Sequence, residues 1–354
     1  MIKRGVALQH FADKCGCGGA NGDVVLEILL LDRLVPEAQA WLEARHHVEP
    51  RPDLAQDPAA LRKVLYNVQG IVLPRKLPIT REFLDFAPVL RVAARLHAGT
   101  DNTDLEACRE HKVRVVQAIS AHVRSNAEYL LASLLLLFRR GIASSLNGDR
   151  NALVSMGREL NGATIGLLGI APTAHTLAGM LESLGAKLIG YDPAVHHTAP
   201  IWERLRIHPV GLQDLLQWSD AVSVQVLYGS RYQHFINDKV LAHCRQGQLW
   251  VGITRSELFE PEAFAAALAD GRIESAILDG ADTGFAARGT ALYEAKNLYL
   301  TPRLGAQTRE SRVRASWYVA QRLHETLTSP PPNSGFDQLL SAPMGLGDSD
   351  FAPR

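Results

Sequence analysis

The stretch ELNGATIGLLGIAPTAHTLAGMLESLGAKLIGYDP, residues 159–193, decides the fold. Its apolar spacing predicts, in order, a strand, a tight turn, a helix and a second strand, at residues 163–168, 169–174, 175–184 and 187–191. Asp192 follows the second strand, 23 positions after Gly169. In dinucleotide-binding folds such a turn brings backbone N–H groups and a helix N-terminus to a pyrophosphate, and the later carboxylate accepts hydrogen bonds from ribose hydroxyls.

The glycines of this stretch fit the dinucleotide pattern only in part. Ala171 and Ala174 stand where Gly-x-Gly-x-x-Gly has its second and third glycines. Alanine is common at the third position, but a methyl group at the second opposes the close approach of a pyrophosphate to the backbone. Two interpretations follow: a dinucleotide site, or an ordinary strand–helix–strand crossover with no ligand.

Composition narrows the class of partner. The chain has 354 residues, enough for two domains, and its 37 Lys and Arg balance 37 Asp and Glu. No global field therefore attracts nucleic acid or a membrane surface, which favours a small-molecule partner. No apolar run approaches the about 20 residues that span a bilayer, and the N-terminus does not resemble a secretory signal. We expect a cytoplasmic protein.

The cysteines are too few and too scattered for a disulfide framework: Cys15, Cys17, Cys108 and Cys244. The first two, in Cys-Gly-Cys-Gly-Gly, suggest either a metal or redox clip or a loop with reduced thiols. No second pair of Cys or His lies at zinc-like spacing, so we predict no metal site.

The rest of the chain alternates between strand and helix patterns. Strands are predicted at 23–31, 68–73, 90–96, 113–117, 221–226, 248–254, 275–278 and 298–301. Helices are predicted at 36–45, 57–66, 80–86, 102–111, 125–140, 212–218, 237–243, 261–270 and 308–327. Such alternation predicts parallel sheets with helices on both faces, and hence an α/β fold. The Pro- and Gly-rich tail, 329–354, cannot bury enough to fold alone.

Six short motifs follow one another along the chain, and their order is more specific than any one of them. They are LRV with AGTDNTDL (90–92 and 98–105), SNAE (125–128), GLLG with YDP (166–169 and 191–193), TRS (254–256), LD (278–279) and LTPRLG (300–305). Together they resemble the substrate loop, interdomain helix, cofactor signature and catalytic loops of the D-isomer-specific 2-hydroxyacid dehydrogenases. This family includes D-lactate, D-glycerate and 3-phosphoglycerate dehydrogenases.

The resemblance implies two Rossmann-like, doubly wound parallel-sheet domains with a cleft between them. Residues 1–120 with 306–328 would form a flavodoxin-like substrate domain, and 121–305 an NAD-binding Rossmann domain. Family members generally pair through their nucleotide-binding domains, so a homodimer is expected. A closed cleft would exclude water from a hydride transfer.

The resemblance also implies roles for individual residues. Arg255 matches the arginine that holds the substrate carboxylate, for which a planar donor fork is suited. The predicted NAD-binding residues are Gly169, Ile170, Ala171, Pro172, Thr173, Asp192, Thr254 and Asp279. Among them, Asp279 would orient the nicotinamide amide, and Asp192 would favour NAD over NADP because its carboxylate faces the position of a 2′-phosphate. Either aspartate alternatively caps a turn, and Arg255 is alternatively a surface arginine.

The proton donor departs from the family pattern. Arg303 stands at the position of the family's catalytic histidine, and Gly284 at that of its glutamate, with Asp282 two positions away. A guanidinium stabilises an oxyanion but is a poor general acid. If the alignment shifts by two residues, Asp282 forms an ion pair with Arg303.

Other departures suggest substitutes for the missing acid. Gln225 and Leu227 replace a histidine and a proline of the family, and His97 replaces a glycine. His97, His122 and Tyr228 are candidate proton donors, because histidine titrates near neutrality and a cation lowers the pKa of a tyrosine. Each of the three is alternatively a packed or exposed side chain.

Two functions remain compatible with these residues. The first is an NAD-linked oxidoreductase with a rebuilt active site, acting on a small substrate whose carboxylate or phosphate meets Arg255 and Arg303. The second is a non-redox descendant that binds NAD as a sensor, a partner-binding protein or an enzyme with different chemistry.

Overall fold

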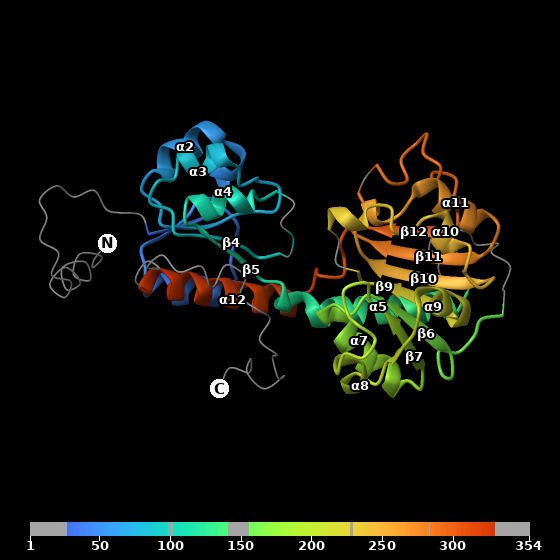
Figure 1. The fold of residues 1–354 in the computed structure, drawn as a ribbon. Coiled ribbons are helices and arrows are strands. Elements are labelled where there is room, and N and C mark those ends of the chain that lie inside the picture. The colour runs from blue at the N-terminus through green and yellow to red at the C-terminus, as the bar shows by residue number, and fades with distance from the viewer. Residues whose placement is uncertain are drawn as a thin grey trace, which may run out of the picture.

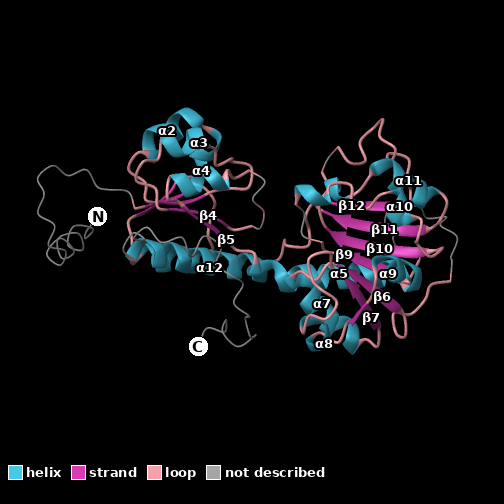
Figure 2. Cartoon of the chain, viewed as in Figure 1, coloured by secondary structure: helices cyan, strands magenta, loops and turns pink. Residues whose placement is uncertain are grey.

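The computed structural model describes residues 27–97, 99, 102–140, 156–226, 229–282 and 284–329. These residues form two lobes, each built on one parallel sheet covered by helices on both faces (Figures 1 and 2). The predicted fold class, two doubly wound α/β domains, is therefore confirmed. Cys15 and Cys17, for which a clip or a loop with reduced thiols was considered, lie outside the described residues, as do Tyr228 and the tail from residue 330.

The first lobe contains a five-stranded sheet of order β2-β1-β3-β4-β5. Its strands are β1 Ile28–Leu30, β2 Val48–Pro50, β3 Gly70–Val72, β4 Val92–Arg95 and β5 Arg114–Gln117. One face packs against α2 Pro58–Leu65, α3 Arg81–Asp85 and α4 Leu105–Glu110. The other packs against α1 Pro36–Glu43 and the last helix, α12 Arg309–Thr328. Strands β1, β3 and β4 are buried along their whole length, as apolar residues at successive positions predict.

The second lobe contains a seven-stranded sheet of order β12-β11-β10-β9-β6-β7-β8. Its strands are β6 Thr164–Leu168, β7 Lys187–Tyr191, β8 His208–Pro209, β9 Ala221–Val224, β10 Gln248–Ile253, β11 Ile273–Asp279 and β12 Leu298–Thr301. One face carries α5 Val123–Phe138, α7 Pro172–Ser183 and α8 Ile201–Arg204. The other carries α9 Leu212–Trp218, α10 Asp238–Leu241 and α11 Pro261–Ala269. The strand order reverses between β6 and β9, where open α/β sheets bind ligands.

The chain crosses between the lobes twice, and polar contacts join the two crossings. At the first crossing, the short 3₁₀ turn Ser120–His122 leads into α5, which Figure 1 shows beside the start of α12. Ser125 donates a hydrogen bond to the carbonyl of Gly305, and His122 Nδ1 lies 2.6 Å from Ser311 Oγ. These bonds fix the return of the chain toward the first sheet.

The structure corrects several predicted boundaries. The helix predicted from His175 begins three residues earlier, at Pro172, because proline suits the first helical position, where its missing N–H has no helical partner. The first described strand is only Ile28–Leu30. Strands β2 and β8 were not predicted; each is a short edge strand that ends in proline, a residue that argues against a strand in the sequence.

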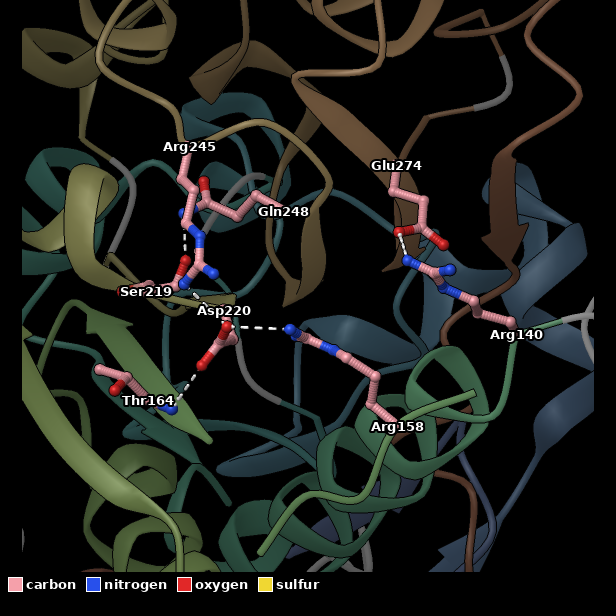
Figure 3. A network of polar contacts seen from close by, with 8 residues as sticks. All are labelled: Arg140, Arg158, Thr164, Ser219, Asp220, Arg245, Gln248 and Glu274. Atoms are coloured by element: carbon pink, nitrogen blue, oxygen red, sulfur yellow. Dashed lines mark hydrogen bonds and ion pairs between the residues drawn. The ribbon is translucent and has the colours of Figure 1, made fainter. Parts of the chain in front are cut away.

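A polar network secures the edge of the second sheet where β6 and β9 begin (Figure 3). The carboxylate of Asp220 accepts hydrogen bonds from Arg158 at 3.1 Å, Arg245 at 2.8 Å and the backbone N–H of Thr164 at 2.9 Å. Nearby, Arg140 pairs with Glu274 at 2.7 Å. This edge is opposite to the carboxyl ends of the strands, so we assign the network a structural role.

None of the described helices is long and apolar enough to cross a membrane.

Candidate active site

The predicted site residues follow the carboxyl ends of parallel strands, which lie at one edge of a sheet. In the second lobe, Gly169, Asp192, Arg255 and Arg303 come after β6, β7, β10 and β12, and Asp279 is the last residue of β11. In the first lobe, the predicted His97 follows β4, and Arg75, which was not predicted, follows β3. The topology therefore gathers on two sheet edges residues that are far apart in the sequence.

Gly169 makes the turn after β6 possible. Its φ of 100° is a conformation that side chains oppose, and a Cβ there would lie 2.4 Å from the backbone nitrogen of Val226. The turn therefore passes against the end of β9, as a dinucleotide-binding turn does.

Asp192 fixes the same turn from the end of β7. Its Oδ2 accepts a hydrogen bond from the N–H of Ile170 at 2.7 Å, and its Oδ1 accepts one from Ala194 at 2.7 Å. Each carboxylate oxygen keeps further acceptor capacity, so a ribose hydroxyl has a partner here. The turn-capping and ribose-binding interpretations of Asp192 are thus compatible.

The first turn of α7 has fewer donors than the usual phosphate-binding turn. Ala171 is the N-cap residue, with φ −68° and ψ 162°, and Pro172 is the first helical residue. Proline has no N–H, so one of the groups that commonly face a pyrophosphate is absent. The backbone N–H of Thr173 remains to serve this role.

The carboxylate of Asp279 organises the loop that carries Arg303. It is only 2% exposed. Oδ1 accepts hydrogen bonds from Thr301 Oγ1 at 2.6 Å and Leu304 N at 2.7 Å, and Oδ2 accepts one from Gly305 N at 2.9 Å. Because the Thr301 hydroxyl donates to Asp279, it accepts from the Tyr129 hydroxyl, which lies 2.6 Å away on α5. Asp279 thus connects the interdomain helix to the loop.

Three buried polar atoms around this sheet edge have no hydrogen-bond partner among the described residues: Asn126 Oδ1, Thr254 Oγ1 and Gln225 Oε1. They belong to the start of α5 and to the residues that directly follow β10 and β9. Buried polar atoms normally have partners, so such atoms indicate a ligand. With the turn at Gly169 and the carboxylate of Asp192, they fit a bound dinucleotide.

The carboxylate of Asp282 connects the two loops that carry the predicted arginines of the second lobe. Arg303 lies 4.0 Å from Asp282, which is the ion pair that the shifted alignment predicted, and Asp282 accepts a hydrogen bond from Ser256 at 2.5 Å. Arg255 lies 3.7 Å from Glu257. Arg303 has a left-handed backbone with φ 60°, and its side chain packs over Gly280.

Arg75, on the loop after β3, is a site residue that the sequence did not single out. Burial lowers its pKa, and the positive charges of Arg303 and Arg255 lower it further, whereas the carboxylate of Asp282 raises it. The three guanidinium groups therefore act on one another. The carbonyl of Arg75 accepts hydrogen bonds from Arg95 at 3.3 Å and from Asn102 at 3.0 Å. The sequence feature that could have indicated Arg75 is its position just beyond the carboxyl end of a predicted parallel strand.

His97 lines a pocket of the first lobe together with Arg75, Arg95, Gly99 and Asn102. Burial lowers the pKa of His97 from 6.5 to about 3, and the charges of Arg75, Arg95 and Arg303 contribute to this shift. The imidazole of the ligand-free protein is therefore neutral at physiological pH.

His122 has a structural environment that argues against proton donation to a substrate. Its Nε2 donates to the carbonyl of Leu96 at 2.8 Å, so in the neutral ring Nδ1 accepts from the Ser311 hydroxyl at 2.6 Å. Burial lowers its pKa as well. The packed-side-chain alternative explains His122, and we do not assign it a catalytic role.

No cluster of His, Cys, Asp and Glu that could hold a metal ion occurs in the part of the chain that the structure describes.

Comparison with known proteins identifies the family. The model of the D-isomer specific 2-hydroxyacid dehydrogenase NAD-binding domain matches residues 131–305. The (S)-sulfolactate dehydrogenase of Chromohalobacter salexigens is 30% identical over 304 residues, which cover 85% of this chain and 98% of the relative. The chain belongs to the D-isomer-specific 2-hydroxyacid dehydrogenase family. This confirms the family that the sequence motifs indicated, with NAD as the cofactor of the second lobe.

Further similar proteins are consistent with this assignment. The D-3-phosphoglycerate dehydrogenase of Mycobacterium tuberculosis is 29% identical over 303 residues, covering 85% of this chain but 56% of that relative. The chain thus spans little more than half the length of that enzyme. The solved structure of the TT0316 protein from Thermus thermophilus has a TM-score of 0.72 at 26% identity, covering 87% of this chain and 99% of its own. D-2-hydroxyisocaproate dehydrogenase, at 20% identity, shares the fold with a TM-score of 0.72.

Proposed function

We propose that this dehydrogenase acts on a small 2-hydroxy or 2-oxo acid that carries a second anionic group. The observation that carries the proposal is the electrostatic grouping of Arg75, Arg255 and Arg303 from both lobes. The carboxylate of Asp282 offsets part of the repulsion among these guanidinium groups, and an anionic substrate would offset more of it. Two of the relatives are named for sulfolactate and 3-phosphoglycerate, and each of these carboxylates carries a second anionic group.

In the proposed reaction each of the three arginines interacts with a different group of the substrate. Arg255, on the loop after β10, binds the carboxylate through its donor fork. Arg303 lies at the developing negative charge on the C2 oxygen, and Arg75 binds the second anion from the first lobe. The reduced nicotinamide, when bound, supplies the hydride. Asp279 holds Leu304 and Gly305 and so keeps Arg303 in place.

The domain division expected from the sequence fits this proposal. Residues 1–120 with 306–328 would supply Arg75, and residues 121–305 would bind NAD and supply the other two arginines. Pairing of two copies through the nucleotide-binding domains, in the cytoplasm, remains part of the proposal. Sedimentation of the purified protein tests the pairing, and a single sedimenting species of monomer mass would contradict it.

The proposal is tested by the loss of reduced-nicotinamide absorbance with a panel of 2-oxo acids of similar length. Acids that end in a sulfonate, phosphate or carboxylate are compared with acids that end in a methyl group. We expect kcat/KM to be higher by about tenfold or more for the dianionic acids, because each extra charged contact contributes about 1.5–3 kcal/mol. Equal rates for both classes would contradict a second anion site.

A second candidate is a non-redox protein that binds NAD. It is favoured by the missing donor at Pro172 and by arginine at the position of the family's catalytic histidine. Binding of NADH, seen as a change in its fluorescence, together with no turnover of any acid in the panel, would favour this candidate.

A further inference from the structure

His97 is a titratable side chain that faces the arginine group from the first lobe. It follows β4, and the pocket that it lines also contains Arg75 and Asn102. Within the described part of the chain, its ring nitrogens have no hydrogen-bond partner. His122, by contrast, uses both nitrogens. Of these two histidines, His97 is therefore the one whose ring nitrogens are available to a ligand.

The charges that act on His97 are positive and come from several elements. Arg75 lies on the loop after β3, Arg95 on β4, and Arg303 on the loop after β12. The neighbouring titratable group is His122, on the 3₁₀ turn before α5, and it adds to this effect only in its protonated form. Such surroundings disfavour an imidazolium in the empty site. A bound dianion instead favours the imidazolium form of His97, because it places negative charge among the same arginines.

We propose that His97 is the proton donor and acceptor of this dehydrogenase, and that it takes up its proton when a dianionic substrate binds. The inference rests on the proposed function, because it requires that Arg75, Arg255 and Arg303 bind a dianionic substrate. Arg303 cannot take this role, since a guanidinium keeps its proton at physiological pH.

The proposed step balances. In reduction, the hydride forms the new C2–H bond, the π electron pair of the C2 carbonyl moves to its oxygen, and the His97 imidazolium gives that oxygen a proton. The products are the 2-hydroxy acid, the oxidised nicotinamide and a neutral His97. In oxidation, the neutral imidazole accepts the hydroxyl proton, and the substrate gives its hydride to the oxidised nicotinamide.

The test measures proton uptake on binding of a dianion that cannot react. The full-length protein, saturated with NAD, is titrated with sulfoacetate by calorimetry in buffers of different ionisation enthalpy, near neutral pH. The dependence of the heat on the buffer gives the protons taken up. We expect uptake of about one proton per site. The monoanion methanesulfonate controls for charge, and His97→Gln should abolish the uptake while sulfoacetate still binds.

His208→Gln provides the matched histidine control. His208 is exposed on the edge strand β8, so its replacement should leave the uptake unchanged. His97→Asn is a second variant in case His97→Gln does not fold. Sulfoacetate binding to the unaltered protein without proton uptake would overturn the inference but leave the anion site intact, as would uptake that persists without His97. No binding of sulfoacetate would instead overturn the proposed function.

Discussion

The carboxylate of Asp279 lies 2.7 Å from the backbone nitrogen of Leu304, so the end of β11 directly holds the loop that carries Arg303. The same carboxylate accepts from Thr301 and Gly305, and it is buried. Asp279 was predicted to orient a nicotinamide amide, and this remains a prediction. Its observed partners assign it a positioning role as well.

Replacing Asp279 should therefore destabilise the protein and disturb Arg303. Asp279→Ala leaves three donors without an acceptor, and we expect the free energy of unfolding to fall by about 2–4 kcal/mol. Thr301→Val removes one donor to Asp279 and the acceptor of the Tyr129 hydroxyl, and should cost about 1–2 kcal/mol. Urea unfolding measures both. The exposed Glu294 provides the control, since Glu294→Ala should change the stability by less than about 0.5 kcal/mol. Equal stabilities for all these variants would contradict the positioning role.

Pro172→Ala should tighten binding of NADH. The substitution restores an N–H at the first position of α7, where a pyrophosphate oxygen can accept it. One additional hydrogen bond is worth about 1 kcal/mol, or about a fivefold lower Kd. Fluorescence titration measures the change. Pro58→Ala makes the same replacement at the start of α2 in the other lobe and should leave the Kd unaltered. An unchanged Kd for Pro172→Ala would show that this N–H does not reach the cofactor.

Arg75→Ala should separate the two classes of substrate. We expect KM for a dianionic 2-oxo acid to rise by about 10- to 100-fold, as loss of one hydrogen bond between charged groups implies. KM for an acid with a single carboxylate should change by less than about threefold, because Arg255 still binds that group. Arg81→Ala, at an exposed ion pair with Glu110, is the control arginine. An equal rise for both acids would place Arg75 at the carboxylate or in the scaffold.

His97 should make the stability of the ligand-free protein depend on pH. Its pKa is lowered from 6.5 to about 3 by folding, so between these values the unfolded chain binds a proton that the folded protein does not. Stability therefore falls as the pH falls from 6.5 toward 3 and is unaffected by His97 above 6.5. Urea midpoints at about pH 7.5 and about pH 5 should differ more for the natural protein than for His97→Gln. Equal differences would show that His97 is not held neutral.

Periodicity in the sequence predicted the parallel sheets, and the resemblance to the family implied their division into two domains. Apolar runs that alternate with helical patterns predict parallel strands. Two parallel neighbouring strands need a crossover connection, which is usually a helix. The strand, turn and helix of residues 163–183 occur as predicted, with the helix starting at Pro172 rather than His175. The short edge strands β2 and β8 carried no comparable signal. The resemblance of the TRS, LD and LTPRLG motifs to the family's motifs indicated Arg255, Asp279 and Arg303.

Tertiary structure alone decided what several of these side chains do. His97 and His122 were equivalent candidates in the sequence, yet His122 is bonded to Ser311, 189 positions away, whereas His97 lines a pocket beside Arg75. Arg75 acts on Arg303 only because the chain crosses between the lobes and returns. Local patterns fix backbone conformation, whereas protonation and hydrogen bonding depend on neighbours that folding brings from distant parts of the chain.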